Sequence, residues 1–442
     1  MTYKEARVYL DEMSKYGSVL GLDVVRELLA ELGDPQEKLR FIHIAGTNGK
    51  GSVLALVSSV LSEAGFKTGR YTSPAVFSDL ERMQIDGVWI SKTEFAELIE
   101  EVQKAIVRME TRGISSPTVF EIETAVAFLY FCKKKCDYVV LETGLGGDLD
   151  ATNVVANTEI AVFTTISRDH MGFLGDSLEE IAQKKAGIIK PGCVVVSAAQ
   201  QPEVCRVLKE QAEHKECALV FARPEQAVLL EENYRELLFS YPFSNRNPGK
   251  EAKDDEESGR MQFRMGMTGC YQVDNAVTAL EAVRRLPVSS AAVRDGFARA
   301  EWPGRFTGIV QKPAFLIDGA HNVDAVKRLR ESVERYFPGR QLFLIMGVFR
   351  DKEYRRMAEI LAPLAKQIYT VNLPDQKRGL PAEELKEAFL PFCVGEVQAA
   401  GNISAAVSLA LQEAREEDVI LACGSLSYLG KVKAEVKRMT DG

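Results

Sequence analysis

Apolar residues fall along the chain in two alternating patterns, and this alternation predicts the class of fold. Short runs with β-branched members predict buried strands at Phe41–Ala45, Tyr138–Leu141 and Ile160–Ile166. After the first run, apolar positions recur at helical spacing over residues 53–64, and Gly65 stands where a glycine would end a helix. Strands that alternate with helices predict an α/β protein with a largely parallel, doubly wound sheet.

Four Ser/Thr-x-x-Glu sequences mark further helix starts. In such a capping box the hydroxyl and the carboxylate each accept a hydrogen bond from the other residue's backbone N–H. The four begin at Thr2, Ser91, Thr118 and Ser177, and we expect a helix after each. Asp86-Gly87 stands between short apolar runs and predicts a β-hairpin.

The alternation of strands and helices breaks and then restarts, which predicts a second domain. A polar segment rich in both charges, Asn245–Arg260, is expected to be an exposed loop between two strands. New strands are expected at Phe315–Ile317, Leu342–Met346, Ile368–Val371 and Val419–Ala422. We place the boundary near Arg299–Pro303, which gives domains of residues 1–299 and 300–442.

Composition and charge narrow the class of protein. The 442 residues are 46% apolar and 27% charged, as in soluble globular proteins, and a net charge of −8 argues against nucleic-acid binding. No uninterrupted apolar run is long enough to span a membrane, and the acidic, amphipathic N-terminus differs from a signal peptide. Of eight cysteines only Cys132 and Cys136 are close in sequence, and no second pair completes a zinc site. We therefore expect free thiols in a reducing cytoplasm.

The first predicted strand leads into a glycine-rich loop, Gly46–Ser52, at the start of a helix. Backbone N–H groups and the helix dipole converge on a phosphate in this geometry. Lys50 would supply a charge for the β- and γ-phosphates, and Ser52 a hydroxyl suited to Mg²⁺. The usual P-loop pattern is not met, because Gly51 separates Lys50 from Ser52 and Ile44 replaces the first glycine. The alternative is an ordinary glycine-rich turn.

Polar residues at other strand ends form a second candidate set. Glu142 and His170 each follow a predicted strand on the side where open α/β sheets bind ligands, and Ser73 follows another. A carboxylate, an imidazole and a hydroxyl that converge near the phosphate loop suit a divalent metal, although each alone could merely cap a loop. The presence of Lys50 nearby favours the functional interpretation. His43 lies inside the first strand and is expected to be a packed core residue.

In the second domain, an arginine and an aspartate occupy similar positions. Arg305 suits a phosphate or transition-state charge, and Asp318 suits ribose hydroxyls, unless Asp318-Gly319 is only a turn. Gly424-Ser425 follows a strand in the same way. The residues alone therefore predict a two-domain, metal-dependent enzyme that uses ATP, and they do not name its substrate.

A series of motifs covers most of the chain. They are Ala45-Gly-Thr-Asn-Gly-Lys-Gly-Ser52, Thr72-Ser-Pro74 with Glu81-Arg82, Phe120-Glu121, the run from Leu141 to Val154, Asp169-His170, Phe173-Leu-Gly175, Lys185 to Gly192, Trp302 to Phe306, Asp318 to Asn322, and Cys423-Gly-Ser425. Their order and spacing resemble the folylpolyglutamate synthase/dihydrofolate synthase family, a branch of the Mur ligases. The resemblance implies a P-loop ATPase-type domain followed by a smaller Rossmann-like domain, with ATP and substrates between them.

The resemblance also implies roles for individual residues. ATP would be bound by Thr47, Asn48, Gly49, Lys50, Gly51, Ser52, Asn275, Arg305 and Asp318. Two Mg²⁺ ions would be held by Ser73, Glu142, His170 and a carbamylated Lys185, with Lys50, His170 and Lys185 acting in catalysis. The pterin-bearing substrate would contact Phe120, Glu121, Leu149, Asp150 and Ala151, and glutamate would lie near His321 and Ser425.

Five positions depart from the family pattern, and two of them fall around the pterin and substrate loops, which leaves the substrate preference open. Ala75 replaces a histidine, Thr143 a valine, Asp148 an arginine, Tyr271 a histidine and Val323 a proline. The resemblance implies that a folate carboxylate attacks the γ-phosphate of ATP and that glutamate's amine then attacks the resulting acyl phosphate. A Mur-type ligase for another carboxylate and a non-catalytic nucleotide-binding regulator are the alternatives. We expect a cytoplasmic monomer that binds folate or dihydropteroate and L-glutamate, and neither nucleic acid nor membrane.

Overall fold

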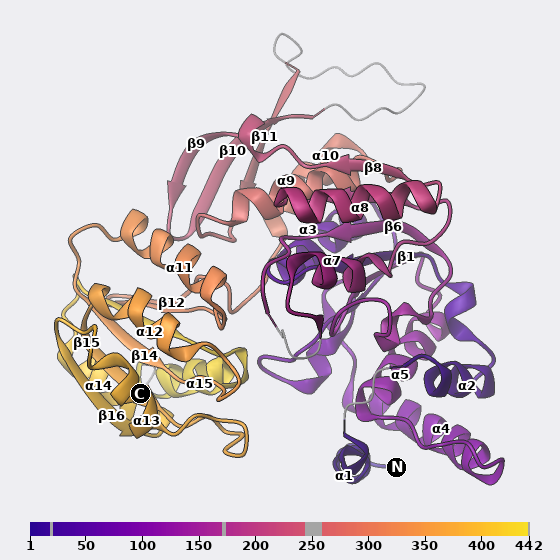
Figure 1. Ribbon diagram of the computed structural model, residues 1–442, viewed down its shortest axis with the longest axis horizontal. Helices are drawn as coiled ribbons and strands as arrows, with labels where there is room; N and C mark the ends of the chain where they lie inside the picture. Colours follow the sequence, from indigo (N-terminus) through magenta and orange to yellow (C-terminus); the bar gives the residue numbers. More distant parts are fainter. Residues whose placement is uncertain (18–20, 170–173, 244–258, 441–442) are drawn as a thin grey trace.

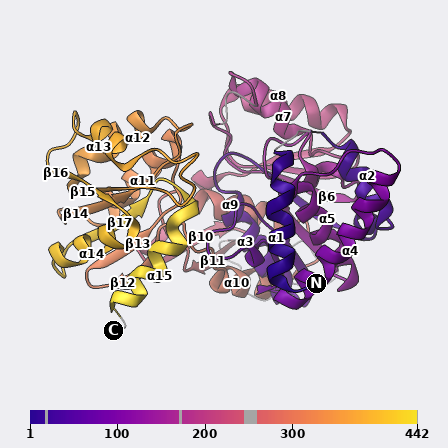
Figure 2. The same ribbon diagram turned by 90° about the horizontal axis from the view of Figure 1, so that it is seen from below.

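The computed structural model describes residues 1–17, 21–169, 174–243 and 259–440, arranged as two lobes (Figures 1 and 2). The larger lobe is built on a sheet of order β4-β3-β2-β5-β1-β6-β7-β8. Its strands are β1 Phe41–Ala45, β2 Thr68–Tyr71, β3 Met83–Ile85, β4 Val88–Trp89, β5 Tyr138–Glu142, β6 Thr158–Phe163, β7 Val194–Ser197 and β8 Ala218–Phe221. All neighbours are parallel except in the β2-β3-β4 meander, whose last turn is the predicted Asp86-Gly87 hairpin.

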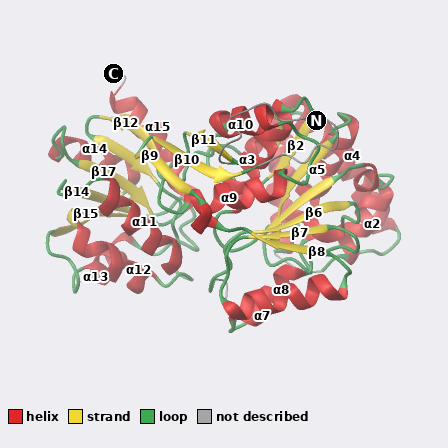
Figure 3. Cartoon of the chain, turned by 90° about the horizontal axis from the view of Figure 1, so that it is seen from above, coloured by secondary structure: helices red, strands yellow, loops and turns green. Residues whose placement is uncertain are grey.

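Helices cover both faces of this sheet, as the doubly wound pattern predicts (Figure 3). They are α1 Tyr3–Met13, α2 Asp23–Glu31, α3 Lys50–Glu63, α4 Lys92–Thr111, α5 Val119–Lys133, α7 Leu178–Ala186 and α8 Pro202–His214. Alternate residues of β1 face opposite cores: Phe41 packs in the cluster that holds α1, α2, α4 and α5, and Ile42 in the cluster that holds α3. His43 is fully buried, as expected. The predicted capping boxes at Thr2, Ser91, Thr118 and Ser177 are all present.

A three-stranded antiparallel sheet and two helices complete the larger lobe. The strands are β9 Val228–Asn233, β10 Glu236–Pro242 and β11 Arg260–Met265, and the helices are α9 Gln272–Val283 and α10 Ser290–Arg299. Helices α9 and α10 both pack against α3. Of the predicted exposed loop Asn245–Arg260, residues 245–258 lie outside the described part of the chain, and Arg260 already begins β11.

The smaller lobe is built on a third sheet, of order β12-β13-β17-β14-β15-β16, which is parallel except for its edge strand β12. Its strands are β12 Thr307–Gln311, β13 Ala314–Ile317, β14 Leu342–Met346, β15 Ala365–Val371, β16 Glu396–Gly401 and β17 Val419–Cys423. Its helices are α11 Val323–Tyr336, α12 Tyr354–Leu361, α13 Ala382–Phe389, α14 Ile403–Glu413 and α15 Leu429–Thr440. The four predicted strands are present, whereas β12 and β16 were missed because none of their residues is buried. Within the described ranges, no helix has the length and apolar character needed to cross a bilayer.

Candidate active site

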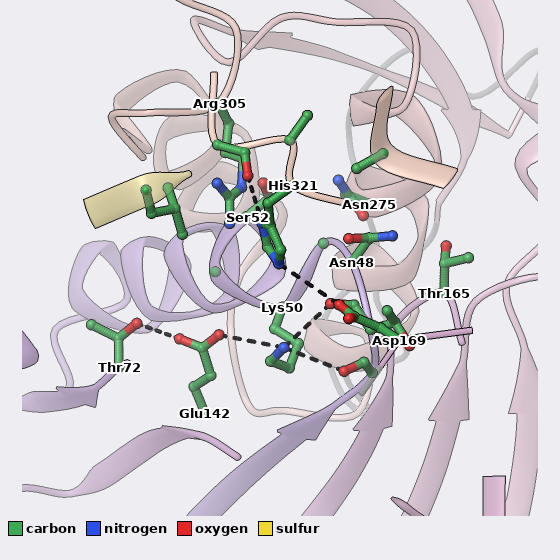
Figure 4. A pocket seen from close by; sticks show the side chains of 18 of the residues that line it. Asn48, Lys50, Ser52, Thr72, Glu142, Thr165, Asp169, Asn275, Arg305 and His321 are labelled. Atoms are coloured by element: carbon green, nitrogen blue, oxygen red, sulfur yellow. Dashed lines mark hydrogen bonds and ion pairs between the residues drawn. The ribbon is translucent and has the colours of Figure 1, made fainter. Parts of the chain in front are cut away.

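A pocket between the two lobes is lined by the loops at the carboxyl ends of strands in both sheets (Figure 4). The following predicted residues line it: Thr47, Asn48, Gly49, Lys50, Gly51, Ser52, Ser73, Glu142, Lys185, Asn275, Arg305, Asp318 and His321. The fold therefore gathers the predicted nucleotide-binding residues of both lobes into one cavity.

The glycines of the loop Gly46–Ser52 allow a close approach of neighbouring elements. Gly46 and Gly49 have φ values of 152° and 91°, the left-handed range that favours glycine. A Cβ on Gly49 would lie 2.3 Å from the Asn275 side-chain oxygen, and one on Gly51 would lie 2.3 Å from Nε1 of Trp302. The loop therefore packs between α9 and the segment that leads into the smaller lobe.

Replacing Gly51 by Ala should destabilise the protein by about 1–3 kcal/mol, the usual cost of overpacking, because the new methyl would meet the Trp302 ring. In a Trp302→Ala background the same replacement should cost less than about 0.5 kcal/mol, since the obstacle is gone. Denaturant unfolding of the four proteins in this cycle measures the coupling. Gly266→Ala is the matched control, because Gly266 has open space around its Cβ position. Equal costs in both backgrounds would contradict this packing.

Lys50 is the first residue of α3 and points its ammonium toward the phosphate loop. Its Nζ donates to the carbonyl oxygens of Gly46 and Thr47, at 3.3 and 3.4 Å, and lies 3.9 Å from the Glu142 carboxylate. The start of a helix also concentrates unpaired N–H groups and positive potential. These features together make an anion site at the mouth of α3.

Two buried oxygen groups beside Lys50 suit a hard cation. The Ser52 hydroxyl is fully buried and has no hydrogen-bond partner among the described residues. The Glu142 carboxylate, at the end of β5, accepts from the Thr72 hydroxyl and from the Ser73 N–H at 3.3 Å (Figure 4). Oxygen donors of this kind are those that Mg²⁺ prefers, so the residues fit the ion.

One member of the predicted metal-binding set lies outside the residues that the structure describes. His170 lies outside the described residues, so its place in the set stays a prediction. In the described part of the chain, no three His, Cys, Asp or Glu side chains cluster as metal ligands. Besides Glu142 and His170, the set implied by the resemblance relies on a serine and a modified lysine.

Two adjacent lysines at the end of α7 point in different directions. Lys185 is buried and donates from Nζ to the Gly46 carbonyl at 3.0 Å. Burial, with the nearby Lys50 charge, lowers the pKa of Lys185 to about 7. Lys184 points away and pairs with Asp148 at 3.1 Å. Burial and a neighbouring cation both favour the neutral form of the Lys185 amine, which is the form that can react as a nucleophile.

The smaller lobe contributes a buried carboxylate that is already well satisfied. Asp318 accepts from the Tyr271 hydroxyl at 2.8 Å and from the Phe306 and Ala320 N–H groups at 2.7 Å each. Burial raises its pKa. The Arg305 guanidinium lies close to Gly319, where a Cβ would be 2.0 Å from its Nη1. Tyr271, one of the departures from the family pattern, is therefore anchored to a residue predicted to contact ATP.

Hydrogen bonds from the phosphate loop and a buried ion pair from the segment after β6 connect the larger lobe to the smaller lobe. The Asn48 amide donates to Asn322 at 3.3 Å and to Asp324 at 3.1 Å, both at the start of α11. Asp169 accepts from Lys352 at 2.8 Å, and both of these side chains are at most 10% exposed. Lys352 was missed in the sequence analysis. Its position shortly after β14, at the same sheet edge as Asp318, was the available signal.

His321 also faces Asp169. Its Nδ1 lies 2.7 Å from the Gly319 carbonyl oxygen, and its Nε2 lies 3.7 Å from the Asp169 carboxylate. Burial lowers the pKa of His321 to about 4, so the ring is neutral at physiological pH. The neutral ring therefore adds no positive charge to this side of the pocket.

Some predicted substrate residues do not line the pocket. Their side chains have structural partners: Glu121 accepts in the capping box of α5, Asp150 accepts from the Leu145 N–H at 2.7 Å, and Ser425 caps the turn that follows β17. Phe120 packs against Gly144 of the pocket wall, with Ala151 buried nearby in the same core and Leu149 exposed. The roles of these residues in substrate binding stay predictions.

Two further departures from the family pattern also have partners in this chain. The Thr143 hydroxyl lies 3.1 Å from Nε2 of His43, and Asp148 forms the ion pair with Lys184. Thr143 lines the pocket, so this hydrogen bond reaches from the phosphate-loop strand to the pocket wall.

Comparison with known proteins identifies the family. Residues 44–283 match the Mur ligase middle domain, and residues 304–426 match the Mur ligase, glutamate ligase domain. A dihydrofolate synthase/folylpolyglutamate synthase of Bacillus subtilis is 33% identical, over 98% of this chain and 99% of that protein. The chain belongs to the dihydrofolate synthase/folylpolyglutamate synthase family of Mur ligases. The family resemblance noted in the sequence is thereby confirmed.

Other members agree over the full length. The corresponding Escherichia coli protein is 30% identical, over 98% of this chain and 95% of its own. A Mycobacterium tuberculosis folylpolyglutamate synthase solved with ADP and AMPPCP superposes with a TM-score of 0.84 at 27% identity, covering 100% of this chain and 99% of that one. An E. coli structure with DHPP and ADP gives a TM-score of 0.83 at 28% identity, covering 99% and 98%. The chain is an ATP-dependent glutamate ligase of this family, as predicted, rather than a non-catalytic regulator.

Proposed function

We propose that this ligase adds L-glutamate to tetrahydrofolate and, as a second activity, to dihydropteroate, through an acyl phosphate. The observation that carries the proposal is the phosphate cradle that faces the smaller lobe: the Lys50 ammonium at the mouth of α3 and the buried, unpaired hydroxyl of Ser52. Its support is the full-length similarity to proteins named for these two reactions.

In the proposed reaction, the acceptor's carboxylate attacks the γ-phosphorus of ATP and ADP leaves. Glutamate's amine then attacks the acyl carbon, and inorganic phosphate leaves. Two anions must approach each other in the first step, and Lys50 offsets their repulsion in a site shielded from bulk water. No nucleophilic Ser or Cys is required. Joining the lobes through Asn48 and Asp169 would exclude water, which otherwise hydrolyses the acyl phosphate.

We propose that two Mg²⁺ ions complete the site. Ser52, Ser73, Glu142, His170 and Lys185 would hold them. When bound, Mg²⁺ supplies positive charge against the phosphate oxygens. For Lys185 we propose a carbamate, formed when the neutral amine captures CO₂, because this converts a cation into an oxygen ligand. The ATP contacts proposed for Asn275, Arg305 and Asp318 would come from residues that line the same pocket.

Changing Glu142 to Gln, or His170 to Ala, should raise the Mg²⁺ concentration needed for half-maximal activity by about tenfold or more. The shift is expected for Glu142→Gln because Glu142 lies beside Lys50 at the end of β5, and replacing its carboxylate by an amide would remove a charged oxygen ligand. A Mg²⁺ titration of ADP release measures the shift, with the exposed Glu97→Gln as control. If neither mutant shifts the titration, both residues only cap loops.

A direct test of the function uses purified protein, ATP, Mg²⁺ and glutamate, with either tetrahydrofolate or dihydropteroate. Mass spectrometry should show products heavier by one glutamyl residue or more, and ADP release should require both co-substrates. Activity with one acceptor alone would show a monofunctional enzyme. If neither acceptor supports ADP release, the result would favour a Mur-type ligase for a different carboxylate.

We also propose substrate contacts, a domain boundary, a cellular location and an oligomeric state. The pterin would contact Phe120, Glu121, Leu149, Asp150 and Ala151, and glutamate would lie near His321 and Ser425. The domains would divide at residues 299 and 300, where the chain passes from α10 toward β12. A cytoplasmic location agrees with the eight cysteines, which are all free thiols, and we propose that the protein is a monomer. Light scattering of the purified protein tests the oligomeric state.

A further inference from the structure

A pair of thiols lies at the other end of the large sheet from the phosphate loop. Val194 of β7 pairs with Ala218 of β8, so the residues just before them, Cys193 and Cys217, stand side by side at the start of two parallel strands. Their Sγ atoms are 3.8 Å apart. Cys193 and Cys217 are far apart in sequence, so the sheet topology alone brings them together.

The backbone geometry at this point suits a disulfide. Neighbouring strands lie about 4.8 Å apart, within the Cα–Cα separations of about 4.4–6.8 Å that disulfides span. The two sulfur atoms already point at each other, so a bond of about 2.05 Å needs side-chain rotation and a small strand shift. The Cys217 thiol also donates to the Lys190 carbonyl oxygen at 3.1 Å, which holds it beside its partner.

The two thiols differ in accessibility, which sets the order in which they would react. Cys193 is 3% exposed, and burial raises its pKa to about 11. Cys217 is partly exposed at the surface, between Lys215 and the Lys190 carbonyl. A small oxidant can therefore reach Cys217 first, and Cys193 lies where it would resolve the intermediate.

We propose that Cys193 and Cys217 are a reversible thiol–disulfide modification site that reacts with low-molecular-weight disulfides such as oxidised glutathione. The Cys217 thiolate attacks one sulfur of the oxidant, forms a mixed disulfide and releases one glutathione thiolate. The Cys193 thiolate then attacks the Cys217 sulfur, which forms the protein disulfide and releases the second glutathione. The two cysteine thiols lose two electrons and two protons, and the oxidant becomes two thiols.

Closing this bond would tie β8, the edge strand of the sheet, to β7 and enclose α8 in a covalent loop. A cross-link of this length lowers the entropy of the unfolded chain, so the oxidised protein should unfold at a higher temperature, by on the order of 5 °C. Neither cysteine lines the active-site pocket, so ATP-dependent turnover should stay within about twofold of that of the reduced protein.

The test uses the full chain equilibrated with equal concentrations of reduced and oxidised glutathione, followed by trapping of free thiols and mass mapping. Cys205 shares a tryptic peptide with Cys193, so the peptides are mapped in a Cys205→Ser protein, where only Cys193 can form a link from that peptide. Because the Cys205→Ser protein should still form the link, it is also the control for loss of a cysteine that lies outside the pair. We expect a Cys193–Cys217 linked peptide that a dithiol reductant removes, and none in Cys193→Ser or Cys217→Ser. A mixed disulfide on Cys217 without the cross-link, or a cross-link to another cysteine, would overturn the proposal.

Discussion

Lys50→Ala should lower ADP and phosphate release at least a hundredfold while leaving the protein folded. Within the described residues that line the pocket, Lys50 is the cation at the mouth of α3, and its charge opposes repulsion that is greatest in the transition state. One preorganised electrostatic donor is worth about 10²–10³ in turnover, so we expect a loss of at least a hundredfold, about 2.7 kcal/mol. Turnover under saturating ATP, Mg²⁺ and both co-substrates measures it.

The control for Lys50 is Lys104→Ala. Lys104 lies on the exposed face of α4, pairs with Glu100 at 2.9 Å and should be neutral for activity. Circular dichroism and thermal unfolding of both variants establish that the fold is intact. A folded Lys50→Ala protein that keeps near-normal turnover would remove the basis of the proposed phosphate cradle.

Lys185→Ala should also lose activity by about a hundredfold, and a small carboxylic acid such as acetate or formate should restore part of it. The reason is that the buried amine, with a pKa lowered to about 7, is poised to become a carbamate, and a free carboxylate can replace that oxygen ligand. The wild-type protein should carry the mass of one added CO₂ on Lys185, which is lost in CO₂-free buffer.

The adjacent Lys184 provides the matched control. Its side chain is partly exposed and paired with Asp148, so the Lys184→Ala protein should keep its activity. In the wild-type protein, Lys184 should carry no added mass.

The pH dependence of carbamate formation at Lys185 has a defined sign. Below a pH of about 7 the Lys185 amine is protonated and cannot capture CO₂, so reactivation of stripped enzyme by bicarbonate should be faster above that pH than below it. Full activity of Lys185→Ala in CO₂-free buffer would show that Lys185 is only a helix-end lysine.

Features that depend on residues a few positions apart could be predicted from the sequence alone. The capping boxes at Thr2, Ser91, Thr118 and Ser177 are present because their hydrogen bonds join residues three positions apart. The strand, glycine loop and helix around Lys50 were predicted for the same reason, since glycine's left-handed conformation and the helix start are both local. The alternation of strands and helices was enough to predict a doubly wound sheet.

Contacts between distant residues depended on the tertiary structure. Lys184 and Lys185 are equally basic in the sequence, and only the packing of α7 decides which ammonium is buried against Gly46 and which meets Asp148. Lys352 reaches Asp169 because the strand orders of two sheets bring their carboxyl ends together. The fall in the Lys185 pKa likewise follows from burial, which no local pattern specifies. Sequence patterns therefore predicted which elements form, and the folded chain decided which side chains meet, because that depends on how strands far apart in sequence are ordered.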